Sequence, residues 1–247
     1  MAPTDPGHEA GLTLRPATAE DVAAVAALHV ATRRASEPLV PPLTHTDDEV
    51  RARVAGLVAG AYVETWVAVT GDEVVGYATF TQTWLDDLYV APGHQRAGIG
   101  SALLELVESQ RPGGFSLWVF ETNAPARAFY RRHGLVELEH TDGSANEEHA
   151  PDLQMAWLGS DPLVLLRRLI DELDDELAVL LARRTALTAT VQDQKEVGGR
   201  AGRDPAREAE IIDRMLGHVP GMDRERVARI MHTVIDESLA AWEDRQV

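Results

Sequence analysis

The sequence predicts two domains of different class, a mixed α/β domain followed by an all-α domain of three helices. The chain has 247 residues, which exceeds the commonest size of a single domain. Its first half alternates apolar and polar residues with the period of strands. After Gly159–Pro162 the apolar spacing becomes three to four, the period of amphipathic helices. We therefore expect domains at residues 12–158 and 162–247.

The α/β half combines strand and helix patterns in mixed order. Strands are expected around Leu14 and at residues 67–69, 74–80, 88–90 and 115–120. Helices are expected at residues 19–34, 47–59, 100–110 and 124–133. Gly71 and Asp72 fall in the turn of a hairpin.

The second half predicts one long helix and two shorter ones. Ser160 or Asp161 can cap the long helix, which is expected from about 162 to 195. Asp204 begins a second helix and Asp223 begins a third. A helix that long, with only two partners in its own chain, leaves much of its apolar stripe uncovered. We therefore expect a homodimer formed through this domain.

Composition excludes several classes of protein. The formal net charge of −17 disfavours non-specific binding to nucleic acids or anionic membranes. The absence of cysteine excludes disulfides and thiolate metal sites, and we expect no metal. No apolar run approaches the ~20 residues of a membrane span, and no signal-peptide pattern opens the chain. We therefore expect a cytoplasmic protein.

The run from Asp87 to Leu104 is a strand, a glycine-bearing turn and the start of an amphipathic helix. Such a turn points backbone N–H groups outward at a helix N-terminus, which favours a phosphate or pyrophosphate. We expect side chains at Gly98 or Gly100 to block the approach of that ligand. From this pattern alone, an ordinary strand–helix connection remains the alternative.

Two motifs resemble the GNAT-type N-acetyltransferases. The run Gln95-Arg96-Ala97-Gly98-Ile99-Gly100 fits that family's Gln/Arg-x-x-Gly-x-Gly/Ala signature. The run from Asn123 to Leu135 is similar to its second motif, an Asn followed by a helix with Phe-Tyr and a closing glycine. The resemblance covers roughly residues 12–158. It implies a GNAT-like central sheet with flanking helices, and acetyl transfer from acetyl-CoA to an amine.

The same resemblance implies roles for individual residues. The acetyl-CoA site would comprise Val90, Gln95, Arg96, Gly98, Gly100, Ser101 and Asn123. Tyr130 would protonate the leaving CoA thiolate, a role that suits a phenol. The alternative is a core aromatic residue. The base that deprotonates the amine stays open among Asp86, Asp87, Glu64, His45 and a water chain, and the acceptor is unknown.

Lys195 is the only lysine among the 23 lysine and arginine residues, which favours a site that needs a compact ammonium group. Arg184 falls within the apolar stripe of the long helix. Lys195 follows 11 residues later, on the same face and ~16 Å away. Two cations that face a core are costly unless an anion meets them. The alternative is a helical bundle with scattered surface ion pairs.

Residues 166–174, 180–184, 195 and 203–210 resemble the all-helical chorismate mutases. The resemblance covers roughly 162–245 and implies a Claisen-type rearrangement of chorismate to prephenate. It implies that Arg184 and Arg207 bind the substrate's carboxylates and that Lys195 donates a hydrogen bond to the ether oxygen. Arg167 lies ~25 Å along the helix from Arg184, so it would join the site of the other subunit.

The resemblance also assigns Glu208 and Asp204 to the substrate hydroxyl and its surroundings, and Ser238 to a further site position. Trp242 stands where the family usually has Gln, or sometimes Glu, as a second donor to the ether oxygen. The pocket is then reshaped, helix three is shifted, or the site is weakened. A chorismate analogue such as 4-amino-4-deoxychorismate is therefore an alternative substrate.

In two further alternatives, only one of the two domains is an active enzyme. The helical domain would serve only as a dimerisation or ligand-sensing module for the acetyltransferase. Conversely, a degenerate acetyltransferase domain would only bind CoA or regulate the mutase.

Overall fold

The computed structural model describes residues 11–219 and 221–246. The chain divides into two compact units between Arg167 and Arg168. This division lies inside helix α5 (Pro162–Asp193), a few residues beyond the expected boundary. Leu165, in the first turn of α5, is fully buried and lies beside Gly114, so the start of this helix belongs to the first unit.

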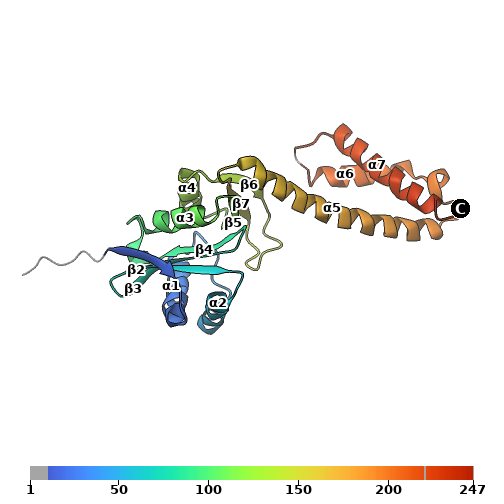
Figure 1. The fold of residues 1–247 in the computed structure, drawn as a ribbon. Helices are drawn as coiled ribbons and strands as arrows, with labels where there is room; N and C mark the ends of the chain where they lie inside the picture. The colour runs from blue at the N-terminus through green and yellow to red at the C-terminus, as the bar shows by residue number, and fades with distance from the viewer. Residues whose placement is uncertain (1–10, 220, 247) are drawn as a thin grey trace, which may run out of the picture. The chain divides into compact units, whose positions relative to one another are not determined.

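The first unit contains two antiparallel sheets (Figure 1). The first sheet has the order β1 (Leu12–Pro16), β2 (Glu64–Thr70), β3 (Glu73–Phe80), β4 (Leu85–Val90). The second has the order β5 (Phe115–Phe120), β7 (Asp152–Trp157), β6 (Val136–His140). One parallel bridge pairs Trp84, just before β4, with Ser116 in β5. Within the described residues these two strands share no further pairing, so each keeps a free edge beyond the bridge.

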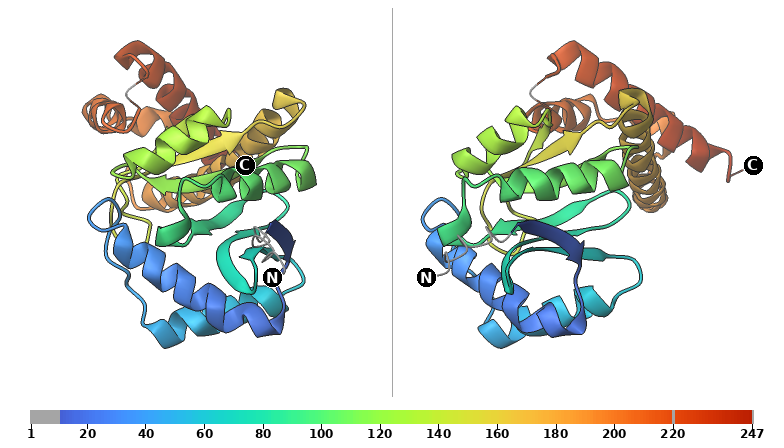
Figure 2. Two further views of the ribbon diagram at one scale, coloured as in Figure 1. Left: turned by 90° about the vertical axis from the view of Figure 1, so that its left-hand side faces the viewer. Right: turned by 60° about the vertical axis from the view of Figure 1, so that its left-hand side comes forward.

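Helices cover both faces of the first sheet (Figure 2). The helices of this unit are α1 (Val22–Ala35), α2 (Asp47–Ala59), α3 (Ile99–Gln110) and α4 (Ala124–Arg132). Alternation along β3 sends Tyr77 into the core with α1 and α2, and its neighbour Ala78 into the core with α3. At Gly76 a Cβ would lie 3.0 Å from the Ile99 side chain, so this glycine lets α3 approach the sheet.

The expected mixed α/β class is confirmed, but strands β6 and β7 were not predicted. β6 is largely exposed and reads Val-Glu-Leu-Glu-His. β7 is the central strand of its sheet, yet it carries the buried polar residues Asp152 and Gln154. Neither strand therefore has the regular apolar alternation that marks a strand in sequence.

The second unit contains the remainder of α5 with α6 (Pro205–Leu216) and α7 (Arg224–Glu243), which confirms the expected three helices. Asp204 caps α6 by accepting hydrogen bonds from the amides of Ala206 and Arg207, both at 3.1 Å. α6 and α7 pack through a small core that contains Ile212, Val227 and Met231.

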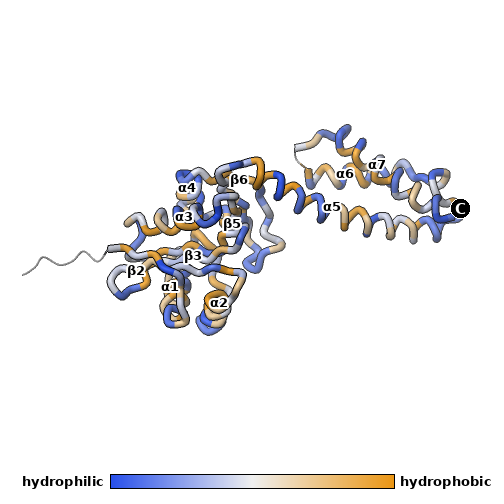
Figure 3. The backbone as a smooth tube through the Cα atoms, viewed as in Figure 1, coloured by the Kyte–Doolittle hydropathy of each residue, from blue (hydrophilic) through white to orange (hydrophobic). Residues whose placement is uncertain are grey.

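An apolar stripe along α5 stays exposed in a single chain. Its members are spaced by three to seven residues and are each more than half exposed: Ile170, Leu173, Leu177, Leu180 and Leu187. Figure 3 shows hydrophobic segments recurring along this helix. Within the described residues, no helix is long and apolar enough to cross a membrane.

Candidate active sites

The turn between β4 and α3 presents unpaired backbone donors. Arg96 and Gly98 both adopt the left-handed conformation, with φ of 64° and 84°. Gly98 is the N-cap of α3, and the amides from Gly98 to Ser101 have no acceptor among the described residues. Successive free N–H groups at a helix N-terminus favour an anion, and the binding of a phosphate or pyrophosphate at this turn stays a prediction.

The two glycines of this turn differ in their protein surroundings. Gly98 has open space around its Cβ position, and its positive φ is what favours glycine. A Cβ on Gly100 would lie 3.6 Å from the Phe129 ring and from Val90, which is ordinary contact with the protein. A single methyl group at Gly100 therefore meets only ordinary contacts with the protein, and the predicted block to a ligand's approach stays a prediction.

The neighbouring strand and helix contribute further polar groups near this turn. The Val90 carbonyl accepts weak hydrogen bonds from Thr32 Oγ1 and Gln95 Nε2, both at 3.4 Å. The side-chain oxygen of Asn123 caps α4 by accepting from the Ala126 amide at 3.2 Å, which leaves its amide nitrogen for a ligand. Ser101 and His133 form a hydrogen bond of 3.0 Å that ties α3 to α4.

Tyr130 lies on α4 and is mostly buried, with its ring packed edge-on against Phe129. Burial raises the pKa of Tyr130 above its ordinary value, so the phenol is protonated at neutral pH. The hydroxyl has no hydrogen-bond partner among the described residues. This tyrosine therefore both packs in the core and carries a proton that it can donate.

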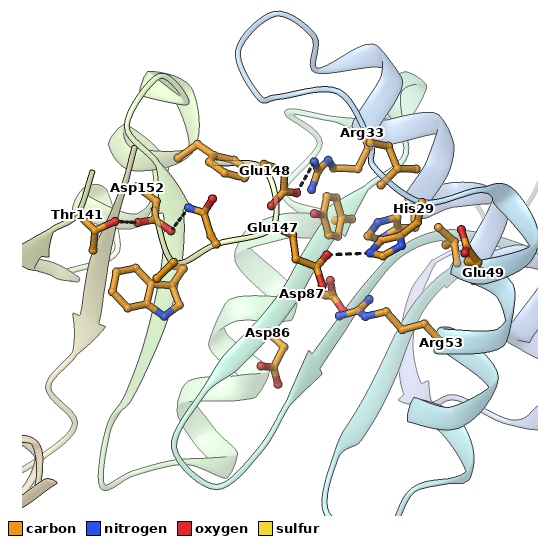
Figure 4. A pocket seen from close by; sticks show the side chains of 18 residues that line it. His29, Arg33, Glu49, Arg53, Asp86, Asp87, Thr141, Glu147, Glu148 and Asp152 are labelled. Atoms are coloured by element: carbon orange, nitrogen blue, oxygen red, sulfur yellow. Dashed lines mark hydrogen bonds and ion pairs between the residues drawn. The ribbon is translucent and has the colours of Figure 1, made fainter. Parts of the chain in front are cut away.

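A cavity of about 770 Å³ lies beside β4 and β5 (Figure 4). Its charged lining comprises six carboxylates and two arginines: Glu49, Asp86, Asp87, Glu147, Glu148, Asp152, Arg33 and Arg53. His29 and His45 also line it. With neutral histidines the lining is net negative, which favours a cationic ligand.

Most of these carboxylates are already paired. Buried Asp87 accepts from Thr79 Oγ1 at 2.6 Å and from Arg53 Nη2 at 3.0 Å. Two ion pairs join the β6–β7 loop to the helical side of the cavity (Figure 4). They link Glu147 to His45 at 2.8 Å and Glu148 to Arg33 at 2.9 Å.

Of the four predicted base candidates, the structure brings three to this cavity and separates the fourth. Glu64 lies elsewhere, in an ion pair of 2.5 Å with Arg111, which corrects its expected place in an acceptor pocket. Asp86 is the cavity carboxylate with no partner among the described residues. Burial, together with the charge of Asp87, raises the pKa of Asp86.

Sequence analysis missed His29, Arg33 and Arg53, which line the cavity from α1 and α2. Burial lowers the pKa of His29, whose Nδ1 lies 2.7 Å from the buried Tyr77 hydroxyl. These residues are far in sequence from the acetyltransferase motifs. Charged residues on two separate helices form no short sequence motif that would mark them as the lining of one cavity.

In the second unit, a cavity of about 290 Å³ brings together five of the predicted polar residues: Arg184, Lys195, Asp204, Arg207 and Glu208. α5 supplies Arg184, the chain just beyond α5 supplies Lys195, and the start of α6 supplies the others. Apolar side chains of α5, α6 and α7 form the rest of the wall: Leu187, Val191, Ile211, Ile235 and Leu239. With Arg203, four cationic side chains therefore line one small cavity.

Ser238 positions Arg184 from α7. Arg184 Nη1 donates to Ser238 Oγ at 3.0 Å, and Ser238 is itself almost fully buried. Burial lowers the pKa of Arg184, which nevertheless stays charged at physiological pH. The predicted link between Ser238 and the site thus runs through Arg184.

Arg203 and Gln192 line this cavity and were not predicted as site residues. Arg203 donates to both oxygens of Glu208, at 2.8 and 2.6 Å, and these bonds lower the pKa of Glu208. Arg203 directly precedes Asp204, and Gln192 lies three residues before Lys195. Their closeness in sequence to Asp204 and Lys195 was the only signal that could have pointed to them.

Trp242 and Arg167 do not line the cavity. The Trp242 indole N–H donates to Asp193 Oδ1 at 2.6 Å, and its ring lies where a Cβ on Gly198 would be 2.6 Å away. This placement corrects the expected substrate-binding role of Trp242. Arg167 falls at the end of the first unit, and the expected contribution from a second subunit stays a prediction.

No group of three or more His, Cys, Asp or Glu side chains that could hold a metal ion occurs in the part of the chain that the structure describes.

Comparison with known proteins finds similarity for both units. Residues 61–137 match the family model "Acetyltransferase (GNAT) domain", and residues 166–242 match "Chorismate mutase type II". The peptidyl-lysine N-acetyltransferase YiaC of Escherichia coli K12 is 31% identical over 107 residues, covering 41% of this chain and 70% of that protein. The solution structure of apo YjaB from Escherichia coli superposes with a TM-score of 0.50 at 22% identity, covering 61% of this chain and 99% of YjaB.

The helical unit has its own relative. The bifunctional chorismate mutase/prephenate dehydratase of Escherichia coli K12 is 33% identical over 81 residues, which cover 32% of this chain but only 21% of that protein. These matches define a fusion of two enzyme classes. The chain belongs to the GNAT acetyltransferases through its first unit, and its second unit matches the type II chorismate mutase model over residues 166–242.

Proposed function

We propose that the chain is a bifunctional enzyme whose second unit rearranges chorismate to prephenate. The observation that carries this proposal is the convergence of Arg184, Lys195, Arg207 and Glu208 on one small cavity. The rearrangement breaks a C–O bond while a C–C bond forms, and it exchanges no proton with the protein. It needs a dicarboxylate held compactly and a cation where charge builds on the ether oxygen. Arginines suit the carboxylates, and the Lys195 ammonium group suits the oxygen.

We further propose that this unit works as a homodimer. Its exposed stripe on α5, from Ile170 to Leu187, is too long to leave in water without a partner. A second copy is the natural cover, because a two-fold axis buries the same stripe on both chains. Arg167, on the same helix, would then complete the site of the other subunit.

The first unit is proposed to transfer acetyl from acetyl-CoA to a cationic amine. The free amides from Gly98 to Ser101 would hold the pyrophosphate, and the free edge of β4 near Val90 would receive the pantetheine arm. The net negative cavity of about 770 Å³ would receive the amine. The new C–N bond forms as the C–S bond breaks, and Tyr130 protonates the thiolate that leaves.

Asp86 is the proposed acceptor of the amine's proton. It is the cavity carboxylate without a partner among the described residues, and its raised pKa makes it a better base than an ordinary aspartate. Asp87, by contrast, is committed to Arg53 and Thr79. The acetyl acceptor named for the Escherichia coli relative YiaC is peptidyl-lysine. A lysine peptide is therefore a suitable first probe.

One experiment tests both activities on the same purified protein. Chorismate consumption is followed with and without acetyl-CoA, and thiol release from acetyl-CoA is followed with a lysine peptide and with its pre-acetylated form. Arg184→Ala should abolish the first reaction only, and Asp86→Asn should slow the second about 10²-fold or more. Glu49→Gln is the matched control, because that cavity carboxylate is occupied by the cap of α2. A protein that consumes no chorismate under either condition contradicts the mutase assignment.

A further inference from the structure

Gln192 places a neutral hydrogen-bond donor in the cavity of the helical unit. Its side chain is 6% exposed and lines the cavity from the last turn of α5. It lies three residues before Lys195, and the Lys195 amide turns back to the Gln192 carbonyl at 3.2 Å. Both side chains line the cavity, where Gln192 contacts Gly199 and Lys195 Nζ donates to the Gly202 carbonyl at 2.8 Å.

The orientation of the Gln192 carboxamide is fixed by the backbone of Gly199. The Gly199 amide donates to Gln192 Oε1 at 3.0 Å. An N–H group requires an acceptor, so the oxygen faces Gly199 and the NH2 group is on the other side of the planar amide. This position favours glycine, because residue 199 has a φ of 64° and a Cβ there would lie 2.5 Å from the Glu243 side chain. Among the described residues, Gln192 Nε2 has no hydrogen-bond acceptor.

Trp242, on α7, does not supply an uncharged hydrogen-bond donor to the cavity. Its indole N–H is used by Asp193, and its ring covers Gly198 and Gly199 from outside the cavity lining. The ring therefore supports the loop that anchors Gln192 but offers no donor to a ligand. The cavity has several cationic donors, whereas Gln192 supplies an uncharged one beside Lys195.

We propose that Gln192 is a catalytic residue whose Nε2–H donates to the ether oxygen of the substrate, together with the Lys195 ammonium group. This inference rests on the proposed chorismate mutase activity. As the C–O bond breaks, negative charge grows on that oxygen, and a donor already aimed at it stabilises the transition state more than the ground state. No proton leaves Gln192 in this step.

The test replaces Gln192 with glutamate and follows kcat/KM on chorismate from pH 8 to pH 5. Gln192→Glu keeps an oxygen for the Gly199 amide but sets a carboxylate against the ether oxygen. We expect a loss of about 10²–10³-fold at pH 8. Relative to the unmutated protein, the rate should recover by up to tenfold per pH unit as pH falls, because the protonated acid donates again. Recovery in the same sample also shows that the variant is folded.

Gln194→Glu is the matched control. Gln194 is exposed, lies two residues away and receives the same change in charge. It should retain the unmutated rate and pH profile. The inference is overturned if Gln192→Glu stays within threefold of the unmutated protein at pH 8, or if its loss is the same at every pH. An unmutated protein that leaves chorismate intact overturns the proposed function and this inference together, whereas an active protein with an indifferent Gln192 overturns the inference alone.

Discussion

Arg203 binds Glu208 through two hydrogen bonds, from Nε at 2.8 Å and from Nη2 at 2.6 Å. The pair lies inside the proposed chorismate site, where Glu208 is expected to hold the substrate hydroxyl. Hydrogen bonds from Arg203 are the largest cause of the lowered pKa of Glu208. Arg203 therefore keeps this carboxylate ionised at pH values where an ordinary glutamate begins to protonate.

Arg203→Ala should shift the acid limb of the mutase pH profile to higher pH. Without the guanidinium the pKa of Glu208 rises towards its ordinary value of about 4.3, so activity is lost earlier as pH falls. The measurement is kcat/KM on chorismate between pH 4 and pH 8. Arg224→Ala removes an exposed ion pair with Asp213 and should leave the limb in place. An unmoved limb in Arg203→Ala would show that Glu208 does not need its charge.

Substitutions in the turn before α3 should separate the backbone shape from the anion site. Gly100→Asp sets a carboxylate beside the free amides and should abolish acetyl-CoA binding measured by calorimetry. Gly98→Ala forces a side chain into the left-handed region, at a cost of about 1–2 kcal/mol, and should weaken binding without abolishing it. Gly93→Ala is the control, because it has a negative φ and open space. Full affinity in Gly100→Asp would place the cofactor elsewhere.

Asp21 should stabilise the first unit in a pH-dependent way. It is buried, accepts two hydrogen bonds from Arg15 at 2.7 and 2.8 Å, and caps a helical turn with Thr18. The Arg15 guanidinium lowers the pKa of Asp21, so this stabilisation is present above the unfolded pKa of about 3.9 and is lost as pH falls through the folded value.

Asp21→Asn should therefore lower the free energy of unfolding at pH 7 by about 1.5–3 kcal/mol, with a smaller difference below pH 4. Denaturant unfolding of the first unit, followed at both pH values, measures this effect. Asp47→Asn breaks the exposed pair with Arg34 and should cost less than about 1 kcal/mol. A constant deficit across pH would mean that the charge of Asp21 contributes nothing.

Features set by neighbouring residues could be predicted from the sequence. The caps at Asn123, Asp204 and Asp223 and the breaks at glycines are local, so the helix positions follow from them. Helical spacing likewise predicted that Arg184 and Lys195 meet, and both line one cavity, although α5 ends at Asp193 and Lys195 lies just beyond the helix. Pairings across long separations could not be predicted. The ion pair of Glu64 with Arg111 depends on two strands and a helix end meeting in the folded unit.

The same limit applies to the sites. The turn proposed to bind acetyl-CoA follows from a short motif, whereas the cavity proposed for the amine is lined from helices, strands and a loop that the chain brings together only on folding. Trp242 shows that a position within a motif does not determine where the side chain lies. Its register on α7 matched a substrate-binding position, but its hydrogen bond to Asp193 takes it out of the cavity lining.

Mixing two inactive variants should test the shared site. Arg167→Ala and Lys195→Ala should each lack mutase activity as pure proteins. After exchange of subunits, one site of each mixed dimer carries both changes and the other carries neither, so partial activity should return. Sedimentation with one labelled variant confirms that exchange occurred. Proven exchange without recovered activity would contradict a site completed by Arg167 of a second subunit.

The most direct test of the central claim is the rate of prephenate formation from chorismate by the unmutated protein and by Lys195→Arg. This substitution keeps the positive charge but replaces a compact ammonium group with a planar guanidinium. We expect steady formation of prephenate by the unmutated protein and a loss of about 10²-fold or more in Lys195→Arg, with acetyl transfer unchanged in both. Equal rates in the two proteins, or no prephenate from either, would contradict the account.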